Sequence, residues 1–178
     1  MKNVQIEDKF FEEFIPGEEI EVFVSEMANK IDSHYENKNV LLLGILNGSF
    51  MIVSDLVKEM TIDPEISFIK VASYEGTSST GQVKSLIGLQ GDLNGRDVLI
   101  VEDIVDTGNT LKHIVDLLSE RGAKSVKIAT LFYKPEAYSH TIPLDFVGKE
   151  IPDRFVIGYG MDYNGRGRNL SSLYQLCP

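Results

Sequence analysis

A short apolar run at residues 98–101, Val-Leu-Ile-Val, is followed at once by two carboxylates and a turn, which restricts the folds open to this chain. The run is β-branched and too short for a helix, so it predicts a strand buried on both faces of a sheet. Glu102 and Asp103 cannot continue such a strand in apolar surroundings without partners. We therefore expect them at the carboxyl end of the strand, where open α/β sheets bind ligands.

The next residues, Asp106-Thr107-Gly108-Asn109-Thr110, lead into a helical pattern that places apolar residues at 111, 114, 115 and 118. The N–H groups at the start of a helix, together with the threonine hydroxyls, are suited to holding a phosphate. The competing interpretation is that Asp106 or Thr107 only caps the helix. The chain has no G-x-x-x-x-G-K-[ST] motif, which disfavours a P-loop nucleotide hydrolase.

In the rest of the chain, segments with the apolar spacing of a helix alternate with short apolar runs typical of strands. Helical spacing of apolar residues covers residues 18–36, 50–60 and 111–121, whereas strands are expected at 40–46, 66–72, 83–88, 98–101 and 126–133. This alternation predicts an α/β fold with a mainly parallel sheet flanked by helices. We expect a single domain over residues 1–178, with a core at about 37–133 and a small hood formed by the N-terminal segment and residues 134–178.

Composition excludes several classes of protein. The net charge of −10 argues against a protein that mainly grips nucleic acid, which needs clustered lysine and arginine. Cys177 is the only cysteine, so an internal disulfide is excluded and cysteine offers no metal-ligand spacing. No apolar stretch approaches the roughly 20 residues that span a bilayer, and the N-terminus is too polar for a signal peptide. We expect a cytoplasmic protein without a membrane partner.

Five motifs in this order resemble the type I phosphoribosyltransferases, and among them the branch that acts on 6-oxopurines. They are Leu46-Asn47-Gly48-Ser49-Phe50, Ser73-Tyr74, the acidic motif at 102–110, Lys134-Pro135, and residues 151–159 with Asp162-Tyr163-Asn164 and Arg168. The resemblance extends from about residue 45 to 168. It implies a purine salvage enzyme that transfers a 5-phosphoribosyl group from 5-phosphoribosyl 1-pyrophosphate to hypoxanthine or guanine. It also implies Mg²⁺ as cofactor, a hood that selects the base, and a homodimer or homotetramer.

The resemblance assigns the donor side of the site as follows. The 5-phosphate is held by Thr107, Gly108, Asn109 and Thr110, Glu102 and Asp103 face the ribose hydroxyls and the metal, and Asp106 completes the phosphoribosyl-binding segment. Pyrophosphate is held at the turn Leu46-Asn47-Gly48 if the peptide is cis, and by Arg168, although Arg166 is a nearby alternative. Asn47 stands where the family commonly has lysine, which leaves the role of that charge open. On its own, Asn-Gly is simply a favourable turn dipeptide.

On the base side, the resemblance implies that Lys134 donates to the exocyclic oxygen of the purine, Phe155 stacks on the ring, and the backbone of Val156 meets its edge. Asp162 is the third metal ligand beside Glu102 and Asp103, and it also borders the base. Asp106 is the candidate general base. Ser73 and Tyr74 open a polar segment that would close over the site as a lid. Without the resemblance, Lys134 is an ordinary loop residue and residues 155–157 are a core strand.

Three alternatives remain open. The nearest is a xanthine phosphoribosyltransferase, because the second position of the purine is read largely by backbone groups. A non-catalytic regulator with the same fold would bind the donor without the reaction, but the chain lacks a basic stripe for RNA. A signalling receiver domain also clusters carboxylates at strand ends, but it does not explain residues 107–110 or 155–168.

Overall fold

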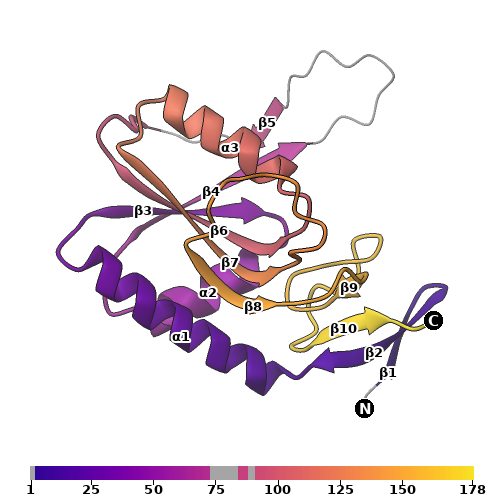
Figure 1. Cartoon of the computed structure of the whole chain (residues 1–178). Coiled ribbons are helices and arrows are strands. Elements are labelled where there is room, and N and C mark those ends of the chain that lie inside the picture. Colours follow the sequence, from indigo (N-terminus) through magenta and orange to yellow (C-terminus); the bar gives the residue numbers. More distant parts are fainter. Residues whose placement is uncertain (1–2, 73–83, 88–90) are drawn as a thin grey trace.

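The centre of the molecule is a six-stranded sheet with the order β5-β4-β3-β6-β7-β8 (Figure 1). The computed structural model describes residues 3–72, 84–87 and 91–178. The strands are β3 (Val40–Leu46), β4 (Glu65–Ala72), β5 (Lys84–Ile87), β6 (Asp97–Val105), β7 (Ser125–Tyr133) and β8 (Phe146–Glu150). Only the pairing of β5 with β4 is antiparallel, and the other four are parallel. The predicted mainly parallel α/β fold is confirmed.

Helices cover both faces of this sheet. Val40, Leu42 and Leu99 pack in one core with α1 (Gly17–Tyr35) and α2 (Phe50–Glu59). The intervening residues Leu41 and Leu43 pack in a second core with α3 (Asn109–Glu120). Because successive side chains of a strand point to opposite faces, the uninterrupted apolar runs fill both cores. Figure 1 shows the sheet between α3 and the pair α1 and α2.

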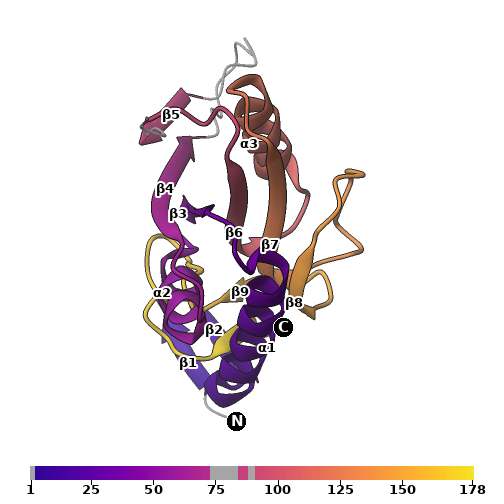
Figure 2. The ribbon, with the colours of Figure 1, turned by 90° about the vertical axis from the view of Figure 1, so that its left-hand side faces the viewer.

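A second, antiparallel sheet joins the two ends of the chain in the order β1-β2-β10-β9. Its strands are β1 (Asn3–Ile6), β2 (Lys9–Ile15), β9 (Val156–Ile157) and β10 (Leu173–Leu176). It has a small core of its own, formed by Phe11, Ile157 and Tyr174. Figures 1 and 2 both place it on the side of α1 and α2, far from α3. We use the name hood for this sheet and the loop between β9 and β10.

Two boundaries differ from expectation. Strand β6 ends at Val105 rather than near Val101, because β7 continues beside it and pairs with it as far as Tyr133. Glu102 and Asp103 therefore lie within the strand. In addition, β8 pairs with β7, so the six-stranded sheet extends beyond the limit expected at residue 133. None of the helices described in residues 3–72, 84–87 and 91–178 is long and apolar enough to cross a membrane.

Candidate active site

The turn after β6 leads directly into α3, as the sequence predicted. Gly108 is the residue before the helix and has a φ of 83°, in the left-handed region that favours glycine. Because the residue before the helix is Gly108, neither Asp106 nor Thr107 occupies the cap position itself, and Thr107 Oγ1 accepts the Asn109 N–H from one residue further back, at 3.5 Å. Glu102 and residues 104–111 line a shallow cavity of about 100 Å³ here. We call residues 107–110 the phosphate loop, after the role that the sequence analysis expects of them.

Three distant segments meet beside this turn. The Leu46–Asn47 peptide is cis. At the next residue, a Cβ on Gly48 would overlap the Asp103 carboxylate, and a Cβ on Gly160 would overlap the Gly48 carbonyl oxygen. The ends of β3 and β6 and the loop after β9 are therefore in direct contact, and only glycine fits at the two crossing points.

Arg168 lies at this junction. Its Nη1 donates to the Gly160 carbonyl oxygen at 2.6 Å, and its Nη2 pairs with Asp162 Oδ1 at 2.5 Å. Arg166, the alternative in sequence, instead pairs with Glu7 at 3.6 Å and is largely exposed. The geometry favours Arg168 as the guanidinium that faces the turn at residues 46–48.

Asp103 and Glu102 are both poorly solvated. Asp103 is 8 % exposed, and burial raises its pKa to about 6, offset in part by hydrogen bonds from its own N–H and that of Ile104. Burial, followed by the charge of Asp103, raises the pKa of Glu102 well above its usual range. Glu102 Oε2 is buried and has no hydrogen-bond partner in the described part of the chain. Neither carboxylate forms an ion pair within the described residues, although the charge of Arg168 lowers the pKa of Asp103, and both have the oxygen chemistry that a hard divalent cation prefers.

Asp162, the third expected metal ligand, is engaged elsewhere. Its Oδ2 accepts the Gly165 N–H at 2.6 Å, while its Oδ1 pairs with Arg168. Within the described residues, no group of three or more histidine, cysteine or acidic side chains is gathered for a metal ion. The structure therefore places two candidate ligands on β6 and the third beside Arg168.

Burial of Asp103 should make the metal-free protein less stable as the pH rises through about 6. The pKa is raised from 3.8 in the unfolded chain, so the folded chain keeps a proton that the unfolded chain releases in this window. The stabilising contribution is complete below the lower value and is lost above the higher one, which amounts to about 3 kcal/mol at most. Denaturant unfolding in a chelator, at about pH 4 and about pH 8, measures it.

Asp103→Asn is the matched variant for this prediction, because it keeps the side-chain shape and cannot titrate. The difference between the free energy of unfolding of this variant and that of wild type should shift in favour of the variant from about pH 4 to about pH 8. A difference between the two proteins that does not change with pH would contradict the assignment.

Lys134 lies in the loop directly after β7, but it is a buried cation rather than an ordinary exposed loop residue. It is 6 % exposed, and its Nζ lies 3.0 Å from Asp106 Oδ2 and 3.3 Å from Asp153 Oδ1. Its N–H donates to the Val105 carbonyl oxygen at 3.0 Å, which fixes it beside the end of β6. The sequence analysis did not single out Asp153. The only signal for it was its position in the same motif as Phe155.

Phe155 is 47 % exposed, whereas Val156 and Ile157 are buried. The core-strand interpretation is therefore right for the last two residues and wrong for Phe155. The Phe155 ring lies 6.0 Å from Tyr163 in an edge-on arrangement and 6.2 Å from Phe11. An exposed ring held by two others is a fitting surface for a planar ligand.

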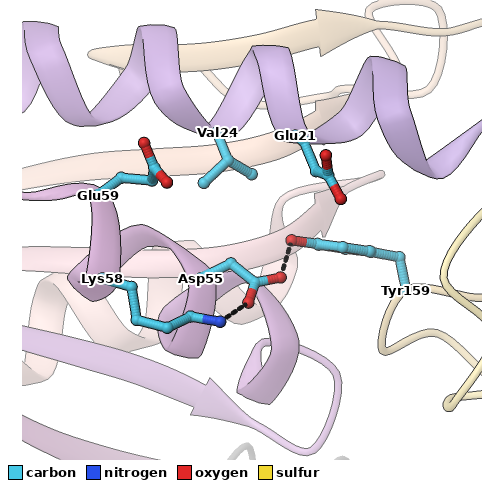
Figure 3. A pocket seen from close by; sticks show the side chains of 6 residues that line it. All are labelled: Glu21, Val24, Asp55, Lys58, Glu59 and Tyr159. Carbon is cyan, nitrogen blue, oxygen red and sulfur yellow. Dashed lines mark hydrogen bonds and ion pairs between the residues drawn. The ribbon is translucent and has the colours of Figure 1, made fainter.

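Tyr159 attaches the hood to the core. Its hydroxyl donates to Asp55 Oδ2 on α2 at 2.6 Å, and Asp55 also pairs with Lys58 at 2.6 Å (Figure 3). Burial and this hydrogen bond raise the pKa of Tyr159. Since α2 begins just after Gly48, the contact ties the loop that carries Arg168 to the helix that follows the turn. The expected lid residues, Ser73 and Tyr74, lie outside the described residues.

Comparison with known proteins gives a consistent result. Residues 12–164 match the family described as phosphoribosyl transferase domain. The chain is 43 % identical over 162 residues to a hypoxanthine phosphoribosyltransferase of Escherichia coli strain K12, covering 89 % of this chain and 91 % of that protein. It is also 43 % identical over 165 residues to a hypoxanthine-guanine phosphoribosyltransferase of Bacillus subtilis, covering 92 % of each.

A crystal structure of a hypoxanthine phosphoribosyltransferase from Staphylococcus aureus superimposes with a TM-score of 0.88 at 41 % identity, covering 94 % of this chain and 91 % of that one. Agreement in sequence and in fold thus covers nearly the whole chain. The chain belongs to the phosphoribosyl transferase family, in the branch of the hypoxanthine phosphoribosyltransferases.

Proposed function

We propose that this protein transfers the 5-phosphoribosyl group of 5-phosphoribosyl 1-pyrophosphate to hypoxanthine or guanine, giving the nucleotide and pyrophosphate, with Mg²⁺ as cofactor. The observation that carries the proposal is Lys134, a buried ammonium that follows β7 and is held between Asp106 and Asp153 beside the end of β6. A fixed donor there suits the exocyclic oxygen of a 6-oxopurine. The amino group of adenine would meet it donor to donor.

The donor side follows from the contacts described above. The N–H groups at the start of α3 and the hydroxyls of Thr107 and Thr110 hold the 5-phosphate. The turn at residues 46–48 and Arg168 hold the pyrophosphate, for which a guanidinium is well shaped. Arg168 is paired with Asp162 in this structure. Binding of pyrophosphate would give Arg168 a second anionic partner and would weaken its ion pair with the Asp162 carboxylate.

The carboxylates fit a magnesium ion. The buried, unpaired Glu102 Oε2 and the neighbouring Asp103 would hold it, with the ribose hydroxyls completing its oxygen ligands. Asp162 is the candidate for the third magnesium ligand supplied by the chain. Bound Mg²⁺ supplies positive charge to the departing pyrophosphate.

The residues of the chain itself bind, orient and move a proton. Phe155 and the backbone of Val156 orient the base, and Lys134 fixes its oxygen. Asp106 is 49 % exposed and forms an ion pair with the Lys134 ammonium. It takes the proton from purine N7 as N9 attacks the sugar. Departure of pyrophosphate leaves an oxocarbenium-like sugar, so positioning of both reactants contributes to the rate.

Product formation with four bases tests the proposal. Hypoxanthine, guanine, xanthine and adenine are each supplied with the donor and Mg²⁺, and nucleotide is measured by chromatography. Nucleotide from the first two and none from adenine is expected, and the rate with xanthine ranks the xanthine phosphoribosyltransferase alternative. No nucleotide from any base, with the donor still bound, would instead favour the non-catalytic regulator. Omitting Mg²⁺ should abolish product formation.

We also expect a homodimer or homotetramer located in the cytoplasm, as members of this family suggest. Sedimentation or light scattering of the purified protein tests the first expectation.

A further inference from the structure

Three consecutive residues cross over the phosphate loop from outside. The Tyr138 ring covers Gly108 so closely that a Cβ there would overlap it. Ser139 donates to the Thr107 carbonyl oxygen from its N–H at 3.3 Å and from its hydroxyl at 3.1 Å. His140 Nε2 lies 2.8 Å from Asn109 Oδ1. We call residues 138–140 the strap, because each of its residues contacts a different residue of the loop.

The strap follows closely after Lys134, the residue proposed to contact the base. Both Ala137 and Tyr138 donate their N–H to the Lys134 carbonyl oxygen at 3.2 Å, which forms a turn directly after Lys134. The strap is further held by the Tyr138 hydroxyl, which donates to the Ile142 carbonyl oxygen at 2.7 Å. Its position is therefore fixed at both ends.

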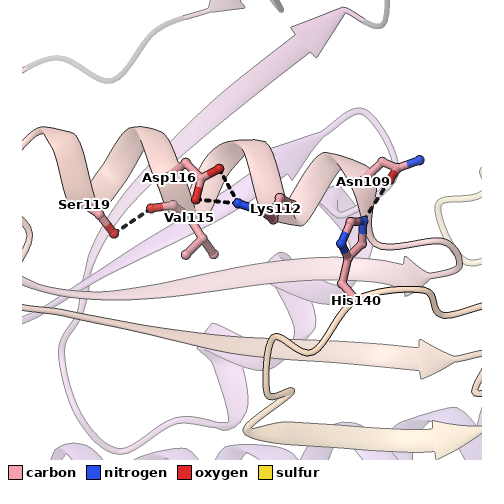
Figure 4. A network of polar contacts seen from close by, with 6 residues as sticks. All are labelled: Asn109, Lys112, Val115, Asp116, Ser119 and His140. Carbon is pink, nitrogen blue, oxygen red and sulfur yellow. Dashed lines mark hydrogen bonds and ion pairs between the residues drawn. The ribbon is translucent and has the colours of Figure 1, made fainter.

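The contact between His140 and Asn109 has a defined polarity. A carboxamide oxygen only accepts, so His140 Nε2 carries the proton and donates. This occupies the acceptor of the Asn109 amide and leaves its Nδ2 donors without a hydrogen bond in the described part of the chain. Figure 4 shows the Asn109 nitrogen turned away from His140. An amide fixed in this way presents only donors, which is the polarity that an anion requires.

The next cation along α3 cannot take this role. Lys112 Nζ is bound to both oxygens of Asp116, at 2.9 and 2.6 Å, one turn further along the helix (Figure 4). Lys134 is likewise engaged by two carboxylates. The Asn109 amide is thus a side-chain donor at the mouth of the cavity that is not committed to another group.

We propose that His140 is a positioning residue for the 5-phosphate: by donating to Asn109 Oδ1 it turns the Asn109 amide donors toward the phosphate of the donor substrate and of the nucleotide product. This rests on the proposed function, which supplies the phosphate. It assigns to the strap a role in phosphate affinity that is separate from base selection by Lys134.

The test compares ligands with and without the 5-phosphate. Calorimetric titration of inosine 5-monophosphate and inosine into wild type, His140→Ala, His140→Gln and Asn109→Ala gives the preference of each protein for the phosphorylated ligand. We expect His140→Ala to reduce this preference about fivefold to tenfold, less than the roughly 10-fold to 100-fold for complete loss of a hydrogen bond to a charged group, because the Asn109 amide is still present. Steady-state kinetics should show the same rise in KM for 5-phosphoribosyl 1-pyrophosphate, with kcat and KM for hypoxanthine within about twofold.

Two variants separate positioning from mere structure. His140→Gln retains an N–H donor for Asn109 Oδ1 and should recover most of the lost preference. The double variant of His140→Ala and Asn109→Ala should be no worse than Asn109→Ala alone, because both act through one amide. His113→Ala is the matched control, since it removes a histidine of α3, the helix that begins at Asn109, outside the loop and the strap, and it should bind as wild type does.

The results separate the two proposals. Wild type that binds neither the donor nor inosine 5-monophosphate would overturn the proposed function, and this inference with it. Wild type that binds both, together with an unchanged preference in His140→Ala, would overturn the role of His140 alone. Losses in the two single variants that multiply in the double variant would also overturn it.

Discussion

Asp106→Asn is expected to slow nucleotide formation by about 10² to 10⁴, which corresponds to roughly 3 to 5 kcal/mol of transition-state stabilisation. Asp106 is the carboxylate that lies between the phosphate loop and Lys134, its Oδ2 3.0 Å from the ammonium. Asparagine has nearly the same shape and can still accept a hydrogen bond from Lys134, but it cannot take a proton. The loss should therefore appear in kcat with both hypoxanthine and guanine, while KM for the donor changes little.

Asp153→Asn provides the matched control for that variant. Asp153 is bound to the same ammonium and is exposed to a similar extent, 54 % against 49 % for Asp106. If loss of one negative charge beside Lys134 were the cause of slow turnover, both variants would be slow. Near-normal turnover of Asp106→Asn, measured with thermal unfolding to verify the fold, would remove Asp106 from the role of general base.

Local pattern was sufficient for the core of the fold. The apolar runs at residues 40–46 and 98–101 contain enough β-branched and leucine residues to predict doubly covered strands, and the sheet has them at β3 and β6. The end of β6 was missed because β7 pairs with β6 past Glu102 and Asp103, as far as Val105 and Tyr133, and the sequence of β6 alone does not show that pairing. Strand β8 was missed because Phe146–Glu150 is short and mixed in polarity.

The contacts that complete the site join residues far apart in the sequence. Lys134 with Asp153, Tyr159 with Asp55, and His140 with Asn109 are pairs whose members carry no periodic signal. Motif spacing identified one member of most pairs through the family resemblance. The partner is set by how the hood and the strap fold back on the sheet, which no local pattern encodes.

Lys134→Met is expected to weaken the preference for hypoxanthine over adenine by about 10-fold to 100-fold, the range for a lost hydrogen bond from a charged donor. Methionine keeps the length and apolar stem of the buried side chain but has no donor. The 6-oxo group then loses its partner, and the amino group of adenine no longer faces an ammonium. The ratio of kcat/KM for the two bases measures the effect, and Lys134→Ala should lower the ratio in the same direction with an additional loss of stability from the cavity.

The two variants on either side of the Lys134–Asp106 contact should differ in kind. Asp106→Asn lowers the rate with every base and leaves the ratio between bases unchanged, because proton removal is common to them all. Lys134→Met changes the ratio, because only the group at the sixth position of the purine meets the ammonium. Asp153→Asn retains Lys134 and should keep the wild-type preference for hypoxanthine over adenine. An altered preference in this variant would mean that base selection depends on both carboxylates bound to Lys134 and not on the ammonium alone. An unchanged ratio in Lys134→Met would take the ammonium out of the base site, and the preference would then have to come from Phe155 and the backbone of Val156.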